Sequence, residues 1–171
     1  FRCTGRCLPL NSMENRVYEV EIEVEKTDTL KSPSDRFRII KFYRPGRWSK
    51  EQLEEEHQFL FNLAEHEIPV VAPLRLADGS SLSKLPALDI WFAVFPKIGG
   101  RSPVAGELSD EQLERVGRLL GRMHAVGAAR QATHRVKLDC ETYGDNNLEF
   151  LLSSGSISAT VRERYEAVVR E

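Results

Sequence analysis

Two segments near the start of the chain constrain its fold most strongly. Residues 16–25 alternate glutamates with apolar side chains, which are Tyr18, Val20, Ile22 and Val24. This alternation is typical of a strand with one face in the core and one in solvent. Residues 36–43 form a second strand-like run, and the polar residues 26–35 between the two predict a long hairpin loop. We therefore expect an antiparallel sheet, to which residues 2–10 add a short strand.

Lys41 places a positive charge on an apolar face of the second segment. Alternation puts its side chain on the same face as Phe37, Ile39 and Tyr43. A charge in such a place costs free energy unless it reaches water or a group of opposite charge. Two interpretations are open: Lys41 extends past the strand edge into solvent, or it meets a carboxylate.

The next helix supplies a carboxylate in an equally unusual place. Ser49 and Gln52 form a capping box that predicts a helix from Ser49 to about residue 66. Glu56 lies within the apolar stripe of this helix, whereas Glu54 and Glu55 point elsewhere as solvated charges. Taken alone, Glu56 could sit at the margin of the stripe. Two misplaced opposite charges on consecutive elements favour a pair between Lys41 and Glu56.

The rest of the chain changes from strands to helices. The expected elements are extended residues 68–77 leading into a strand, a turn at Asp78-Gly79, a strand over 89–98 that ends at Pro96, a break at Gly99-Gly100, a helix over 109–126 stopped by Gly127, turn-rich residues 139–147 and a helix over 158–171. This order predicts an α+β fold, with a five-stranded antiparallel sheet and one helix followed by a helical part.

Composition excludes several classes of function. The net charge of −2 gives no sign of a nucleic-acid or anionic-membrane partner, and no apolar run approaches the ~20 residues of a membrane helix. Cys3, Cys7 and Cys140 are interpreted as free thiols in a reducing cytoplasm, with a Cys3–Cys7 disulfide or half of a zinc site as the alternative. The chain begins with Phe1, so we expect it to be part of something longer.

Six segments, taken in order, resemble one known family. They are PLNSMENRVYEV (9–20), IIKFYRPGRW (39–48), EEHQFLFNL (55–63), IPVVAPL (68–74), FAVFPKIGGR (92–101) and LGRMHAVG (120–127). Together they resemble the stress response kinase A family, bacterial serine/threonine protein kinases of the aminoglycoside phosphotransferase-like superfamily. The resemblance implies a protein-kinase-like fold, with an ATP-binding N-lobe over residues 1–98 and the hinge and first C-lobe helices over residues 99–171.

The resemblance also implies a site for the ATP phosphates. Lys41 would contact the phosphates, and Glu56 would hold Lys41 in place. Ser12 and Asn15 would offer hydrogen-bond donors from a loop over the phosphates, although this loop is not rich in glycine. From the residues alone, the loop is interpreted as a simple hairpin turn, because serine and asparagine favour turns.

The hinge between the lobes would bind the adenine base. In this resemblance the Pro96 carbonyl accepts a hydrogen bond from the adenine amino group, and the Ile98 N–H donates to the ring. These assignments suit the two residues, because proline has a carbonyl but no N–H. The alternative is that Pro96 only ends a strand.

The family's catalytic loop, of the HxDxxxxN type, is not found in residues 102–171. Residues 133–147 contain histidine, aspartate and asparagine at other spacings. We therefore expect no catalytic residue and no metal ligand in this chain, which would stop before the catalytic loop. ATP and Mg²⁺ are the implied cofactors, and the metal ligands would lie in the remainder of the C-lobe. The chain alone is expected to be inactive.

Three functions are compatible with the sequence. The favoured one is the ATP-binding part of a serine/threonine protein kinase that phosphorylates protein hydroxyls, in a bacterial stress response. The alternatives are a small-molecule phosphotransferase of the aminoglycoside or choline type and a non-catalytic pseudokinase or interaction module. Exposed apolar stripes at residues 113–123 and 161–168 predict self-association. His124 is interpreted as a packed structural residue, and Gly117 and Gly121 as a close helix contact.

Overall fold

The computed structural model describes residues 1–25, 30–101, 103 and 106–170. The chain divides into two compact units, Phe1–Thr133 and His134–Glu171. The first unit contains β1 (Cys3–Leu10), β2 (Arg16–Ile22), η1 (Pro33–Arg36), β3 (Phe37–Phe42), α1 (Lys50–Glu65), β4 (Ser83–Leu85), β5 (Ile90–Pro96) and α2 (Asp110–Ala128). The second contains η2 (Glu141–Asp145), α3 (Asn146–Ser153) and α4 (Arg162–Arg170). The predicted lobe boundary between residues 98 and 99 is a different division and stays a prediction.

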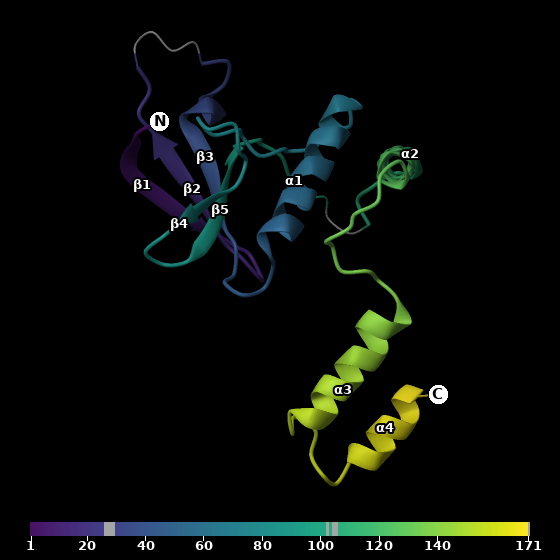
Figure 1. The fold of residues 1–171 in the computed structure, drawn as a ribbon. Helices are drawn as coiled ribbons and strands as arrows, with labels where there is room; N and C mark the ends of the chain where they lie inside the picture. Colours follow the sequence, from purple (N-terminus) through teal and green to yellow (C-terminus); the bar gives the residue numbers. More distant parts are fainter. Residues whose placement is uncertain (26–29, 102, 104–105, 171) are drawn as a thin grey trace. The chain divides into compact units, whose positions relative to one another are not determined.

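The five strands form one antiparallel sheet in the order β1-β2-β3-β5-β4 (Figure 1). The predicted five-stranded sheet followed by helices is thereby confirmed. Strand β2 ends at Ile22, so Val24 is outside it, but the alternation is correct because Val20 and Ile22 are buried. Residues 26–29 of the predicted hairpin loop lie outside the described residues. The rest of that segment includes η1, whose first turn is capped by Ser32 and Asp35.

Helix α1 packs its apolar side against the sheet. The predicted capping box is present: the Ser49 side chain accepts from the Gln52 N–H, and the Gln52 side chain accepts from the Ser49 N–H. The core here consists of Tyr43, Leu53, Leu82 and Ala93, with Trp48, Trp91 and Phe95 packed against it. Both tryptophans are therefore packing residues.

Residues 68–77 are expected to be extended and to lead into a strand, but no strand forms between residues 68 and 82. The edge strand β4 lies at Ser83–Leu85, after a turn in which the Gly79 N–H donates to Leu76 O at 2.9 Å. The earlier segment runs along β5, where the Leu74 N–H donates to Val94 O at 2.7 Å. Pro69 and Pro73 have no N–H, so this segment cannot supply the donors of a continuous strand ladder.

Helix α2 forms as predicted but is packed differently. The capping box of Ser109 and Gln112 is present, and the helix continues through Gly127 to Ala128, so Gly127 does not stop it. The expected close contact at Gly117 and Gly121 is wrong, because a Cβ at either position would meet nothing within 4 Å. Gly127 is the close position, 3.6 Å from the Phe59 ring. The predicted Gly117–Gly121 pair faces away from the contact with α1.

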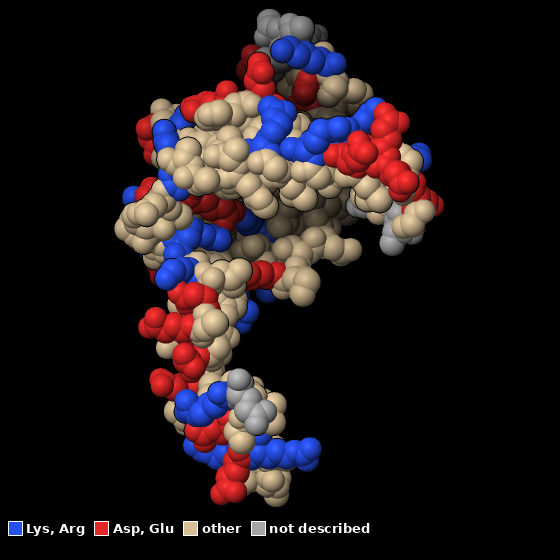
Figure 2. All heavy atoms as spheres, turned by 90° about the vertical axis from the view of Figure 1, so that its right-hand side faces the viewer, with Lys and Arg blue, Asp and Glu red and all other residues tan. Residues whose placement is uncertain are grey.

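The side chains of α2 remain largely in solvent. Ion pairs between Glu111 and Arg115 and between Glu114 and Arg118 run along the helix. Figure 2 shows Lys and Arg side chains interspersed with Asp and Glu side chains on the face that it draws. The apolar stripe of the helix is exposed as predicted, at Leu113, Val116 and Leu120. Self-association through this stripe stays a prediction.

The second unit contains more helix than the sequence analysis predicted. The turn-rich residues 139–147 instead form η2 and the start of α3. Asp139 explains the difference, because its carboxylate accepts from the Thr142 N–H at 2.9 Å and so caps the helical turn. This hydrogen bond, together with side-chain hydrogen bonds from Lys137 and Thr142, lowers the pKa of Asp139 to about 2. The last helix begins at Arg162, which leaves Val161 before it.

Candidate functional site

Lys41 and Glu56 meet as predicted. Lys41 Nζ lies 3.0 Å from Glu56 Oε1, with side-chain exposures of 23% and 29%. The same Nζ lies 4.5 Å from the centre of the Tyr43 ring. The solvent-extended alternative for Lys41 is therefore wrong. A half-buried pair of this kind contributes little net stability, so its main consequence is a lysine ammonium held in a defined position.

The sheet around Lys41 presents an apolar surface. Residues that pair directly across antiparallel strands share a face. Lys41 pairs with Val17 of β2 and with Ala93 of β5, and Val17 pairs in turn with Leu10 of β1. Ile39, two residues before Lys41, lies on the same face. A flat aromatic group could therefore stack against these aliphatic side chains with its charged end toward Lys41.

Residues 11–15 connect β1 to β2 at the end of the sheet near Lys41. The Asn15 N–H donates to Ser12 Oγ at 3.3 Å, and the Arg44 N–H donates to Asn15 Oδ1 at 3.4 Å. Ser12 is exposed, and Asn15 is half-buried. The structure thus contains the hairpin connection that the residues alone predict. The contact of Ser12 and Asn15 with phosphates stays a prediction.

The predicted hinge follows directly from β5. Pro96 is the last residue of the strand, and Ile98 has 66% of its surface exposed. Between them, Lys97 Nζ lies 2.7 Å from Glu19 Oε2 and 4.4 Å from the centre of the Phe37 ring. This ion pair ties the start of the hinge to β2. The adenine contacts of Pro96 and Ile98 stay predictions.

His57 is a buried neighbour of Glu56 for which the sequence predicted no role. Its ring is buried, with Nε2 lying 2.7 Å from Tyr43 Oη and Nδ1 lying 2.8 Å from Ser81 Oγ. Burial lowers the pKa of His57; the charge of Glu56 opposes this shift, and the charge of Lys41 adds to it. His57 therefore joins α1 to Tyr43, the residue after β3, and to Ser81, directly beside Glu56. Its position four residues after Leu53 was the available signal, since this spacing places it on the apolar stripe.

A second glutamate of α1 also has a structural partner. Glu55 Oε1 accepts from the Thr133 N–H at 2.6 Å and from Thr133 Oγ1 at 2.9 Å, so it is not the solvated charge that was predicted. Arg122 of α2 donates to His66 O at 2.9 Å. These contacts hold α1 on the side away from the sheet. His124 is exposed, which contradicts its interpretation as a packed residue.

The described side chains include neither a metal-holding group nor a disulfide. Within residues 1–25, 30–101, 103 and 106–170, no three His, Cys, Asp or Glu residues are grouped so that they could hold a metal ion. Cys3, Cys7 and Cys140 are free and exposed, as predicted. None of the helices in this part of the chain combines the length and apolar character needed to cross a membrane.

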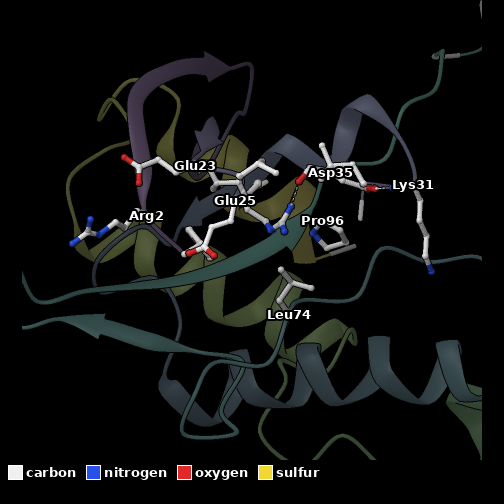
Figure 3. A pocket seen from close by; sticks show the side chains of 12 residues that line it. Arg2, Glu23, Glu25, Lys31, Asp35, Leu74 and Pro96 are labelled. Carbon is white, nitrogen blue, oxygen red and sulfur yellow. Dashed lines mark hydrogen bonds between the residues drawn. The ribbon is translucent and has the colours of Figure 1, made fainter. Parts of the chain in front are cut away.

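A pocket of about 980 Å³ lies near the predicted hinge. Asp35, Leu74 and Pro96 are among its lining residues (Figure 3). Arg38 also lines it and donates through Nη1 to Asp35 O and Phe37 O. Alternation along β3 places Arg38 on the face opposite Lys41. This pocket is therefore separate from the Lys41–Glu56 pair.

Comparison with known proteins gives one family. A family model described as "Phosphotransferase enzyme family" matches residues 7–151. The chain is 43% identical to Stress response kinase A of Escherichia coli (strain K12) over 143 residues, which cover 84% of this chain and 39% of that protein. It is 43% identical to Serine/threonine protein kinase RdoA of Salmonella typhimurium over 135 residues, covering 79% of this chain and 37% of that protein. The chain thus spans about two fifths of the length of these curated relatives.

Two solved structures share the fold. Amicoumacin kinase hAmiN, in complex with AMP-PNP, Ca²⁺ and Ami, matches with a TM-score of 0.64 and 20% identity over 90% of this chain and 48% of that one. A microcompartment-associated aminopropanol kinase matches with a TM-score of 0.60 and 20% identity over 88% of this chain and 50% of that one. These matches confirm the predicted kinase-like architecture, with an N-lobe and part of a C-lobe.

Proposed function

The chain belongs to the phosphotransferase enzyme family, and on this basis we propose that it is the ATP-binding part of a serine/threonine protein kinase. The whole protein would transfer the γ-phosphoryl group of ATP to a protein hydroxyl. Support for a kinase comes from the family and from relatives that are named as kinases. Support for a protein acceptor comes from the name of the Salmonella relative.

The observation that carries the proposal is the contact of 3.0 Å between Lys41 and Glu56. Phosphoryl transfer depends mainly on positioning and on charge stabilisation around the phosphates. In the proposed site, the Glu56 carboxylate fixes the Lys41 ammonium, which then binds phosphate oxygens without first giving up rotamer freedom. The apolar face formed by Leu10, Val17 and Ile39 would cover the adenine ring.

The remaining ATP contacts follow from the same arrangement. Ser12 and Asn15 lie on the loop at the Lys41 end of the sheet and would donate to phosphate oxygens. Pro96 and Ile98 lie at the end of β5 and would bind the adenine edge through their backbone groups. The base and the phosphates would therefore lie along one face of the sheet, from the hinge to the β1–β2 loop.

Mg²⁺ does not fit the described residues as a protein-bound ion, since no carboxylate cluster is placed to hold it. We propose that the metal-binding and catalytic side chains belong to the part of the family's fold that these 171 residues do not span. The 171-residue chain would then bind ATP and transfer no phosphate. A phosphorylation assay on this chain with clear turnover would contradict this.

A small-molecule phosphotransferase is the second candidate. It is favoured by the two structural neighbours, which are named as an amicoumacin kinase and an aminopropanol kinase. Both candidates share the ATP site and differ in the acceptor. Phosphate transfer by the whole protein to a protein hydroxyl or to a small amino alcohol, measured side by side, separates them.

Thermal unfolding with and without ATP tests the shared ATP site. Ligand binding raises apparent stability as RT ln(1 + [L]/Kd), so a concentration of 100 times Kd stabilises the chain by about 2.7 kcal/mol. We expect ATP with Mg²⁺ to raise the melting temperature of the chain by more than that of Lys41→Met. Lys50→Met is the matched control, because Lys50 forms an exposed pair with Glu54, and it should respond like the unsubstituted chain. No shift in any of the three would favour a non-catalytic interaction module.

A further inference from the structure

The loop of residues 11–15 lies close to the proposed phosphate site and contains no glycine. Strand pairing places the residues near both ends of the loop beside Lys41: Leu10 pairs with Val17, and Val17 pairs with Lys41. Met13, in the middle of the loop, is fully exposed. The contact between Asn15 and Ser12 is internal to the loop, so the loop's position relative to the rest of the unit depends on its other side-chain contacts.

Glu14 makes the strongest of these contacts. Its Oε1 accepts from the indole Nε1–H of Trp48 at 2.8 Å and from Nε of Arg47 at 3.3 Å. Both partners lie on the connection between β3 and α1, 33 and 34 residues after Glu14 in the chain. Hydrogen bonds to an ionised carboxylate are stronger than those between neutral groups.

The partners of Glu14 lead directly to the Lys41–Glu56 pair. Trp48 packs against the core of Tyr43, Leu53, Leu82 and Ala93. Its neighbour Ser49 is the N-cap of α1, the helix that carries Glu56. The loop over the phosphates is thereby attached to the same rigid element that positions the phosphate lysine.

The charge of Glu14 argues against direct contact with phosphate. A carboxylate beside a triphosphate would repel it. The guanidinium of Arg47 lies against Glu14 and over the Trp48 ring, at 4.9 Å from its centre, and so compensates the negative charge. Glu14 is therefore suited to hold the loop from the side, with its oxygens turned to Arg47 and Trp48.

We propose that Glu14 is a positioning residue that holds the β1–β2 loop over the nucleotide phosphates through Trp48. This inference rests on the proposed function, because it requires ATP to bind along the Lys41 face. It predicts that loss of the Glu14–Trp48 contact weakens binding of the triphosphate and leaves binding of the adenosine part unchanged. A general structural role would weaken both.

The test measures the affinity of the full chain for ATP with Mg²⁺ and for adenosine by titration calorimetry. Glu14→Ala removes both hydrogen bonds, and Trp48→Phe removes the indole donor but keeps a ring against the core. We expect each substitution to weaken ATP binding about tenfold and the double variant to be no weaker than either single one. Glu14→Gln, which keeps an acceptor oxygen for Trp48, should lie between Glu14→Ala and the unsubstituted chain.

Glu54→Ala is the matched control, because it removes an exposed glutamate that pairs with Lys50 on α1. It should bind both ligands like the unsubstituted chain. Unchanged ATP affinity in Glu14→Ala, or equal losses for ATP and adenosine, would overturn the role of Glu14 while leaving the ATP site in place. Absence of ATP binding by the unsubstituted chain would overturn the proposed function and this inference together.

A fluorescence measurement checks the contact itself without a nucleotide. The chain has two tryptophans, Trp48 and Trp91, so in a Trp91→Phe background the emission reports on Trp48. Glu14→Ala should shift this emission and raise its quenching by acrylamide, because the indole N–H loses its carboxylate partner. Identical spectra and quenching with and without Glu14 would contradict the contact on which the inference depends.

Discussion

Helices α1 and α2 begin alike, but α1 has buried side chains and α2 is largely exposed. Each starts with a serine and a glutamine that form a complete capping box, and each has an apolar stripe. Helix α1 buries Leu53, His57, Asn62 and Leu63, whereas α2 has no buried residue among those described. The local sequence thus determines where each helix begins. Glu56 meets Lys41 because α1, unlike α2, packs against the sheet that carries the lysine (Figure 1).

The largest expected difference between the helices concerns their leucines. Leu53 is completely buried, and Leu120 is 48% exposed. We expect Leu53→Ala to lower the free energy of unfolding by about 2–5 kcal/mol and Leu120→Ala by less than about 1 kcal/mol. Urea denaturation of both variants measures this. Similar losses would contradict the distinction, because they would mean that α2 is packed as tightly as α1.

A smaller effect is expected from the two histidines, one on each helix. His57→Gln cannot reproduce the contacts with both Tyr43 and Ser81, so it should lower the free energy of unfolding by about 1–3 kcal/mol. The same substitution at the exposed His124 should change it by about 0.5 kcal/mol or less. If His124→Gln proved the more destabilising, the contrast between a buried and a solvent-facing helix would be wrong.

The smallest expected effect is the pH dependence that His57 adds. Burial lowers the folded-state pKa of His57 below its ordinary value of 6.5, so the unfolded chain takes up a proton that the folded chain excludes. Its contribution to stability should be complete above about pH 6.5 and decline as the pH falls toward the folded-state pKa. Urea midpoints measured from about pH 8 to about pH 5 should fall less steeply in His57→Gln. Equal slopes would show that another group is responsible.

The sequence predicted the parts of the site that depend on local pattern. Alternation placed Lys41 on an apolar face, and the capping box placed Glu56 on the stripe of α1, so their contact could be inferred before the structure. The hydrogen bonds of His57 with Tyr43 and Ser81 could not, because neither hydroxyl stands out in the sequence as a misplaced charge does. Nothing in a local pattern specifies which hydroxyl a buried histidine will meet.

Two errors have the same physical origin. Residues 68–77 have the composition of a strand, but the prolines remove ladder donors and the edge strand forms at Ser83–Leu85. Residues 139–147 have the composition of a turn, but capping by Asp139 begins a helix there. In both places, the competition for backbone hydrogen bonds decided the structure, and residue type alone did not indicate the outcome.

The central claim is that Glu56 holds Lys41 where it binds the phosphates of ATP. Calorimetric titration of ATP with Mg²⁺ into the unsubstituted chain, Lys41→Met, Glu56→Gln and the double variant tests it most directly. We predict a loss of affinity of about tenfold or more in each single variant, and no further loss in the double variant. Unchanged affinity in Glu56→Gln, or losses that simply add in the double variant, would contradict the claim.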